Sequence, residues 1–261
     1  MELGDYLSKG FSTAFKPKPY LSALFVTIVV GLIFGVGIFA FVASMSAKIM
    51  ATLGPQLTAG QISNPLLALN IFNSIGIGTL VGMGIFFLIV MIIELMGYAF
   101  VFKKIQNNEE NKTESFFSGF DSAIVKGLKL FVSMLIYTII ICITFTIVWL
   151  ITLIPYLGPV LGIILGIILL LYYTCGLFVL YGFTFTSGIS KGVTMALVLP
   201  LKKIHLIGYS LIAMLILCAI GLVLGVIMMI PIIGWIVYIL GLPIILVFFV
   251  SMAYNLAKEE I

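Results

Sequence analysis

Residues 151–162 read ITLIPYLGPVLG, and residues 227–238 read IMMIPIIGWIVY. Both stretches place Ile-Pro-x-x-Gly in the middle of a long apolar run without charges. Pro disfavours helix at the residue before it and removes a backbone donor, and Gly tolerates a chain reversal. We therefore predict tight hairpin turns at Pro155 with Gly158 and at Pro231 with Gly234.

The composition is that of an integral membrane protein. Of 261 residues, 63% are hydrophobic and 8% are charged, whereas a soluble domain has roughly 25% charged residues. A spanning helix needs roughly 20 apolar residues, and the two longest apolar runs are each divided by one of the predicted turns. We therefore expect an all-α fold with six transmembrane helices, at about 21–47, 71–102, 128–153, 157–183, 205–230 and 232–257.

The lysines predict the orientation of these helices. Every basic residue is Lys, and basic residues are retained on the cytoplasmic side of a membrane. Lysines stand before the first predicted helix, between the second and third, between the fourth and fifth, and after the sixth. Only Lys48 falls on the other side. We expect a multi-pass protein of the cell membrane with both termini in the cytoplasm.

The sequence also contains a weak internal repeat. Leu7-Ser8-Lys9-Gly10 recurs as Ile189-Ser190-Lys191-Gly192, with a looser copy at Phe117-Ser118-Gly119-Phe120, and each copy precedes a pair of spans. A shift of about 76 residues aligns the two Ile-Pro-x-x-Gly turns. The prediction is one membrane domain, 1–261, made of three parallel two-helix repeats, with boundaries near 1–110, 111–186 and 187–261. The first repeat differs by an uncharged outer loop at about 50–70.

The segments that precede each pair resemble amphipathic interfacial helices, which lie in the membrane plane. They lie near 3–15, 116–126 and 189–200. Either they are connectors that anchor helix ends, or they sense or displace lipid. Basic side chains near these segments are candidate contacts for anionic lipid: Lys9, Lys16, Lys18, Lys126, Lys129, Lys202 and Lys203.

Glycines four residues apart form a further pattern, for example Gly31 with Gly35, Gly78 with Gly82, and Gly221 with Gly225. Such spacing favours close approach of membrane helices, although hinges for gating remain an alternative. Most of these glycines lie toward the outer ends, whereas aromatic residues are concentrated in the inner halves. This distribution predicts a bundle that is narrow outside and wide inside.

Groups that carry enzyme chemistry are scarce. The chain has one His, His205, and neither a phosphate-binding Gly-rich loop nor a zinc-binding His-Glu-x-x-His helix. No Gly-x-Ser-x-Gly frames a serine. We expect a protein that is not an enzyme, without catalytic residues, metal or cofactor and without a nucleic-acid partner.

Glu94 is the one ionisable residue deep inside a predicted span. An intramembrane carboxylate costs a few kcal/mol and is a functional candidate by default. It either couples to a proton or cation, or is a structural residue that is neutral or paired with a lysine. The aligned positions, Thr174 and Val250, are uncharged, so a threefold ring of acids is not expected.

The entry segments and the Ile-Pro-x-x-Gly turns resemble prokaryotic six-helix membrane families of unknown function, which are similar to the membrane domain fused to some glycerophosphodiester phosphodiesterases. The resemblance implies no functional residue. The resulting hypothesis is a non-enzymatic membrane protein that organises lipid or unknown partner proteins at the cytoplasmic leaflet. The alternative is a transporter or channel with a cytoplasm-facing vestibule and Glu94 as the residue that couples protons or cations.

Overall fold

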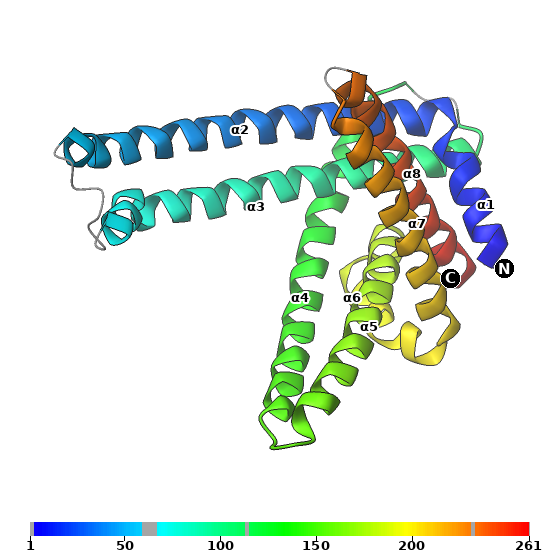
Figure 1. The fold of residues 1–261 in the computed structure, drawn as a ribbon. Coiled ribbons are helices and arrows are strands. Elements are labelled where there is room, and N and C mark those ends of the chain that lie inside the picture. Colours follow the sequence, from blue (N-terminus) through cyan, green and yellow to red (C-terminus); the bar gives the residue numbers. More distant parts are fainter. Residues whose placement is uncertain (1–2, 59–66, 113–114, 231–232, 261) are drawn as a thin grey trace. The chain divides into compact units, whose positions relative to one another are not determined.

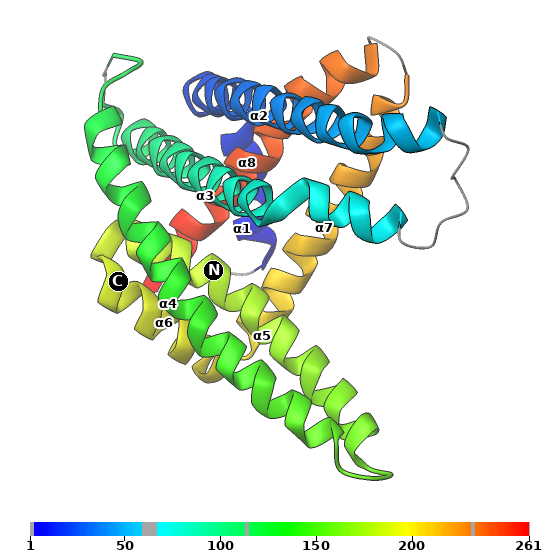
Figure 2. The same ribbon diagram turned by 90° about the vertical axis from the view of Figure 1, so that its left-hand side faces the viewer.

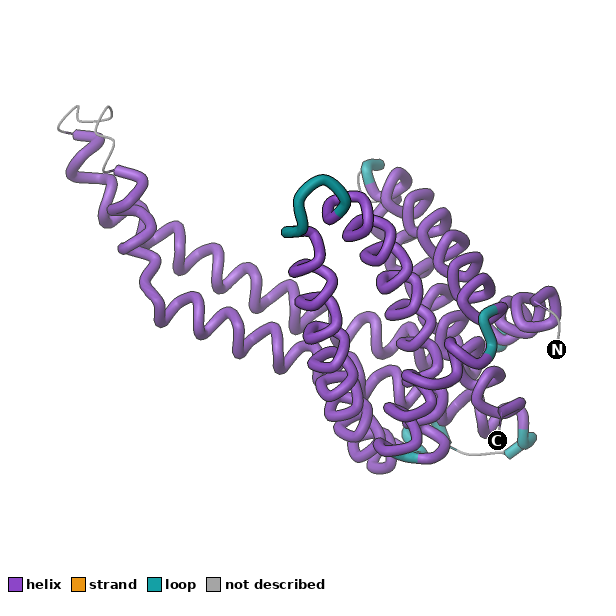
Figure 3. The backbone as a smooth tube through the Cα atoms, turned by 90° about the horizontal axis from the view of Figure 1, so that it is seen from below, coloured by secondary structure: helices purple, strands orange, loops and turns teal. Residues whose placement is uncertain are grey.

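In the computed structural model, which describes residues 3–58, 67–112, 115–230 and 233–260, all regular structure is helical (Figure 3). The expected all-α class is therefore confirmed over this part of the chain. The helices are α1 (Leu3–Ala14), α2 (Pro17–Thr58), α3 (Leu67–Glu109), α4 (Phe120–Thr152), α5 (Gly158–Ser187), α6 (Ile189–Lys202), α7 (His205–Met228) and α8 (Ile233–Glu260) (Figure 1).

Six of these helices are long and apolar enough to cross a membrane. Helices satisfy all their backbone polar groups internally, which is the condition for crossing hydrocarbon. The prediction of six apolar helices is confirmed, and it indicates a multi-pass membrane protein. Their apolar parts are Pro17–Ala51, Gly76–Glu109, Phe120–Thr152, Gly158–Ser187, His205–Met228 and Ile236–Glu260.

The first hairpin contains more helix than the sequence suggested. Helix α2 continues past the expected end at 47 to Thr58, and α3 begins at Leu67. The uncharged loop expected at about 50–70 is therefore partly helical. Helix α3 is interrupted at Gly76, where φ is 67° and ψ is 148°, a conformation that only Gly adopts readily.

The chain divides into two compact units. Unit 1 consists of Met1–Thr27 and Leu95–Ile261, and unit 2 consists of Ile28–Glu94. Unit 2 is thus the larger part of the α2–α3 hairpin. The single domain and the three repeats expected from the sequence remain predictions.

Unit 1 is packed around the ends of its helices that lie nearest the chain termini and the lysine-rich connections; we call these the inner ends. Helix α5 contacts α4, α6, α7 and α8, and Figure 2 shows it running alongside α4. Phe102 lies with its ring centroid 4.7 Å from that of Phe185 and 5.2 Å from that of Tyr254. Other large side chains that are fully buried there are Phe100, Tyr137, Leu180, Phe183 and Phe248.

The outer ends of unit 1, which carry the turns between paired helices, are far less packed. The α4–α5 and α7–α8 hairpins share the inner core and extend away from it in different directions (Figures 1 and 2). The expectation of a bundle that is narrow outside and wide inside is therefore wrong for unit 1. The inner aromatic side chains do not hold the helices apart, because they pack against one another in edge-to-face, tilted and stacked pairs.

The spaced glycines also differ from expectation. No described atom lies within 4 Å of the place where a Cβ would stand on Gly31, Gly35, Gly78, Gly82, Gly166, Gly221 or Gly225. These positions lie on outer, exposed stretches of their helices. A glycine gives close helix approach only where a second helix meets the face that carries the glycine. In a membrane, lipid can cover such a face equally well, since lipid tails are as apolar as side chains.

In the α4–α5 turn, the reason why Gly is needed differs from the one expected. Gly158 has no left-handed backbone; the positive φ, 67°, belongs to Tyr156. A Cβ on Gly158 would instead stand 2.6 Å from the carbonyl oxygen of Ile151, while its own amide donates to Ile154 O at 2.9 Å. Pro155 lies in this turn, between the end of α4 and the start of α5.

The α7–α8 turn repeats these contacts at the same spacing. A Cβ on Gly234 would overlap the carbonyl oxygen of Ile227, seven residues earlier, and the Gly234 amide donates to Ile230 O, four residues earlier, at 2.9 Å. Gly158 makes both contacts at the same offsets. Gly is required at both turns because the close approach of backbone leaves no room for a side chain. Pro231 lies outside the described residues.

The three leading segments have different local structures but similar neighbours. Helix α1 packs against α8, and α6 packs against α5. The middle segment is not a separate helix: residues 116–119 form turns, and α4 begins directly at Phe120. Its aromatic rings contact α3, with Phe116 and Phe120 at 6.1 and 5.8 Å from the Phe100 ring centroid. Each segment thus contacts the second helix of a different hairpin.

Candidate functional site

A basic cavity lies at the inner end of unit 1, with a volume of about 180 Å³. We call it the inner basic cavity. Its lining comes from the start of α2, the end of α3 and the connection that follows α3. The lining residues are Lys18, Ser22, Lys104, Asn107, Asn108, Lys112, Ser115 and Phe116.

Lys104 is the buried lysine of this site. Its residue is 6% exposed, and its Nζ donates to the carbonyl oxygens of Ser115 and Ser118 at 3.0 and 2.9 Å. The ammonium also lies 5.3 Å from the centroid of the Phe100 ring. A buried ammonium needs such acceptors and an aromatic face to offset its lost hydration. Lys104 therefore fixes the connection after α3 while it keeps a positive charge beside the cavity.

The end of α3 places Lys112 at the cavity. Asn111 has a φ of 52°, and the Lys112 amide donates to the carbonyl oxygen of Asn107 at 2.9 Å. This is the Schellman arrangement, in which a left-handed residue closes the last turn of a helix, and Asn tolerates that conformation better than most residues. The short polar run Asn107 to Lys112 thus turns the chain back toward the cavity.

Glu110 partly balances the charge of Lys112. Lys112 Nζ lies 2.5 Å from Glu110 Oε2, and Gln106 Nε2 donates to Glu110 Oε1 at 3.0 Å. These hydrogen bonds, that from Lys112 first, hold the pKa of the Glu110 carboxyl below its ordinary value. The pair is exposed to solvent, so it contributes little to stability.

Lys18 supplies the third lysine. It lies exposed between Pro17 and Pro19 at the start of α2, and the buried Ser22 donates to the Lys18 carbonyl oxygen at 2.9 Å. Three lysines from three separated sequence positions therefore converge on one cavity. Ammonium groups together with serine and asparagine side chains suit a phosphate or carboxylate group.

The other predicted lipid contacts lie elsewhere in unit 1. Lys9 and Lys16 are exposed on α1 and the turn after it, and Lys129 and Lys202 are exposed on α4 and α6. Lys126 is half-buried, with Nζ 5.9 Å from the centroid of the Phe102 ring, and Lys203 pairs with Glu260. Sequence reasoning did not include Lys104 and Lys112. The available signal was the position of Lys103-Lys104 directly after the second apolar run.

Glu94 lies within α3 as the last residue of unit 2, and its side chain is half-buried. It lines neither the inner basic cavity nor the cavity between α2 and α3. Among the described residues, no group of three or more His, Cys, Asp and Glu side chains is placed to hold a metal ion.

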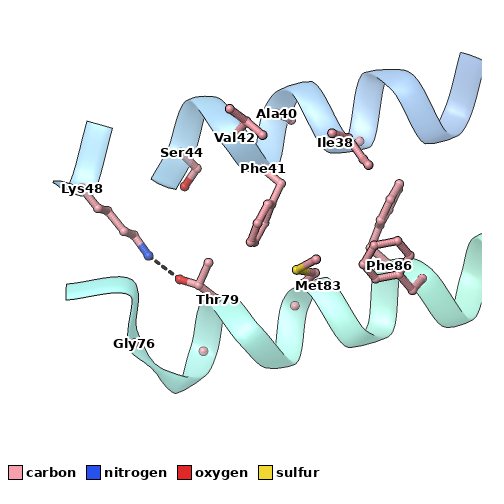
Figure 4. Close-up of a pocket in the computed structure, with 14 residues that line it drawn as sticks. Ile38, Ala40, Phe41, Val42, Ser44, Lys48, Gly76, Thr79, Met83 and Phe86 are labelled. Carbon is pink, nitrogen blue, oxygen red and sulfur yellow. Dashed lines mark hydrogen bonds between the residues drawn. The ribbon is translucent and has the colours of Figure 1, made fainter. Parts of the chain in front are cut away.

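A second, larger cavity lies within unit 2, between α2 and α3, with a volume of about 830 Å³. We call it the hairpin groove. Figure 4 shows Phe41 and Met83 between the two helices, and Lys48 at one end. Lys48 Nζ donates to Thr79 Oγ1 at 2.6 Å. This is the lysine that the charge pattern placed on the outer side.

Comparison with known proteins gives no relative: no protein-family model, curated protein or solved structure matches the chain. The resemblance to six-helix families stays a prediction. Over the described residues, the class of protein that the fold defines is an all-helical protein with six helices long and apolar enough to span a membrane.

Proposed function

We propose that this protein is a non-enzymatic integral membrane protein that binds anionic lipid head groups at the cytoplasmic leaflet and so organises lipid or partner proteins there. The inner basic cavity is the observation that carries the proposal. Lys18, Lys104 and Lys112 bring positive charge to one small cavity next to apolar spans. Clusters of basic residues beside a membrane helix attract anionic lipid.

The charge distribution supports a cytoplasmic position for this cavity. The lysines of the inner ends follow the pattern of basic residues retained in the cytoplasm, and Lys48 is the exception. With this orientation both termini face the cytoplasm of a cell-membrane protein. Anionic lipids give the cytoplasmic surface a negative potential, to which each nearby Lys contributes about 1 kcal/mol of attraction.

Three parallel repeats are part of the proposal. The α4–α5 and α7–α8 turns make the same contacts at the same offsets, and each leading segment contacts the second helix of a different hairpin. Both observations are those expected of three related two-helix units around an axis along the membrane normal. The segments would then form a ring at the cytoplasmic interface, with α1 and α6 as interfacial helices.

The test uses the full chain in nanodiscs of zwitterionic lipid with or without anionic phosphatidylglycerol. Bound lipid is counted by native mass spectrometry after mild removal of the bulk lipid. Lys18→Gln with Lys112→Gln removes two charges of about 1 kcal/mol each, so retention of anionic lipid should weaken roughly 30-fold. Lys104 is left intact because it supports the fold.

The matched control is Lys191→Gln with Lys258→Gln, which removes two exposed lysines, one of α6 and one of α8, that neither line the cavity nor belong to the predicted lipid contacts. This variant should retain anionic lipid as the native chain does. An equal loss in both double variants would indicate diffuse attraction rather than a site. No preference for anionic lipid in the native chain would refute the proposed function.

Glu94 keeps a second candidate function open, since its carboxylate is half-buried within an apolar helix. In this alternative, Glu94 couples transport of a solute to protons or cations. Flux of protons and solutes is measured in proteoliposomes that contain the native chain or Glu94→Gln. Transport that the variant abolishes would favour the alternative; transport that is absent or unchanged would make Glu94 structural.

A further inference from the structure

We propose that the hairpin groove of unit 2 binds a single-chain anionic amphiphile, a long-chain fatty carboxylate, with its chain along the groove and its carboxylate at Lys48. This site is separate from the inner basic cavity and does not depend on lipid binding there. Its volume of about 830 Å³ falls in the range of small-molecule sites, which are mostly apolar with a few polar groups.

The groove has one polar end and one closed apolar end. At the polar end, the Lys48 ammonium and the Thr79 hydroxyl lie 2.6 Å apart (Figure 4). At the other end the ring of Phe86 fills the space over Gly37, where a Cβ would overlap that ring. Phe41 and Met83 line the stretch between. A ligand with one charge and one apolar tail matches this order.

The length of the groove supports a chain that occupies one leaflet. Its α2 lining extends from Gly37 to Lys48, which is about 16 Å along a helix at 1.5 Å per residue. The hydrocarbon core of a bilayer is about 30 Å thick, so one leaflet is about 15 Å. A chain that starts beside Lys48 therefore reaches the middle of the membrane at the closed end.

The charge of the polar end selects the head group. A carboxylate has two oxygens, of which one can accept from the Lys48 ammonium and the other from the Thr79 hydroxyl. The hydroxyl analogue of the same chain has no charge to pair with Lys48. The site should thus distinguish a fatty carboxylate from a fatty alcohol, and the difference should depend on Lys48.

The glycines of the groove allow it to be filled without disturbing the fold. Gly82 lines the groove, and no described atom lies within 4 Å of a Cβ placed on it. Gly31 is equally open but does not line the groove. Gly82→Leu is therefore a blocking variant, and Gly31→Leu is its matched control.

The experiment uses the full chain in nanodiscs with a palmitate analogue that carries a photoreactive diazirine on its chain. After irradiation, peptide mass spectrometry should locate adducts within residues 37–48 and 76–87, and unlabelled palmitate should compete. Gly82→Leu should reduce labelling at least 10-fold, while Gly31→Leu should leave it unchanged.

Lys48→Gln should weaken competition by palmitate about 10-fold without changing competition by hexadecanol, and Lys48→Arg should retain the preference for palmitate.

Labelling of Gly82→Leu at the native level would overturn the site. Equal competition by palmitate and hexadecanol in the native chain would overturn the carboxylate assignment. Loss of labelling when phospholipid is added at the same concentration to the full chain in detergent would overturn the single-chain assignment. The double variant at Lys18 and Lys112 separates the two proposals, because it should label normally even though it loses anionic lipid at the inner basic cavity.

Discussion

The inner core of unit 1 and the hairpin of unit 2 both contain glycine and phenylalanine residues. Several of these residues are closely packed in the core, and several are exposed in the hairpin. In the core, a Cβ on Gly182 would overlap the carbonyl oxygen of Ala253, and one on Gly176 would overlap the hydroxyl of Tyr137. In unit 2, a Cβ placed on Gly31 or Gly82 would have no described atom within 4 Å beyond the nearby backbone of its own helix. The difference shows that glycine spacing alone does not identify a helix contact in a membrane protein.

Aromatic side chains show the same contrast. Phe102 is 1% exposed in unit 1, whereas Phe39 in unit 2 is 76% exposed. In water this difference would be decided by the hydrophobic effect, but lipid tails are as apolar as either environment. Packing density is what distinguishes the two sites, since a buried ring leaves a cavity when it is removed and a lipid-facing ring does not.

The largest expected effect comes from truncating one ring in each region. Phe102→Ala should destabilise the protein by about 3 kcal/mol, because it leaves a cavity among Phe185, Tyr254 and their neighbours. Phe39→Ala should change stability by less than about 0.5 kcal/mol. Thermal unfolding in detergent, followed by circular dichroism, measures both. Similar melting temperatures for the two variants would contradict the contrast between the regions.

A second prediction applies the contrast within one helix, α5. Gly182→Ala should cost about 1–3 kcal/mol, because the added methyl group meets backbone of α8 that cannot move aside easily. Gly166→Ala, at a position with no described atom within 4 Å, should lie between no change and a gain of about 1 kcal/mol, since Ala is the better helix former. The same unfolding assay separates them, and equal destabilisation would show that α5 is packed along its whole length.

The helices could be predicted from sequence because apolar run length and Pro position depend on local physics. Pro155 lies between α4 and α5, and Gly158 is the first residue of α5, so the turn stands where it was predicted. The outer loop near 50–70 was overestimated because Gly54-Pro55 does not end α2, which continues to Thr58. A stretch that contains Pro is therefore a weaker signal for the end of a helix when no chain reversal follows it.

The candidate sites depend on tertiary packing and were less predictable. Lysine positions indicate which ends of the helices are alike, but they do not indicate that Lys18, Lys104 and Lys112 converge on one cavity. Lys48 attracted notice only as an exception to the charge pattern. Its partner Thr79 is an ordinary residue in sequence, and the pairing requires the two helices of unit 2 to be aligned.

A third, smaller effect concerns the contact between the chain termini at the inner end of unit 1. The Tyr6 hydroxyl donates to the Glu259 carboxylate, and burial, followed by this carboxylate, raises the pKa of Tyr6 above its ordinary value of 10.0. Tyr6→Phe should lose about 1 kcal/mol at pH 7, the usual net value of one hydrogen bond.

The pH dependence of this contact follows from linkage. Because the folded state holds the Tyr6 proton more tightly, its contribution is complete below pH 10 and declines as pH rises above that value, where the unfolded chain loses the proton first. The melting temperature, measured from pH 8 to 11, should therefore fall less steeply with pH for Tyr6→Phe than for the native chain. An equal fall in the two proteins would show that the hydrogen bond does not couple to folding.

The smallest expected effect is at the exposed edge of the inner region, where packing contributes nothing and only charge acts. Lys112 lowers the pKa of Glu110, so the ionised carboxylate is favoured in the folded chain. Any stability from this pair is present above the ordinary glutamate pKa of 4.5 and is lost as pH falls through the lower folded value.

Lys112→Gln should raise the Glu110 pKa, measured by carboxyl NMR titration, while the melting temperature at pH 7 stays nearly unchanged because water screens exposed pairs. Gln106→Ala is the milder comparison, since it removes a neutral donor to the same carboxylate. An unchanged Glu110 pKa in Lys112→Gln would show that the turn at Asn111 does not hold Lys112 in place, and the lining of the inner basic cavity would then lack one of its three lysines.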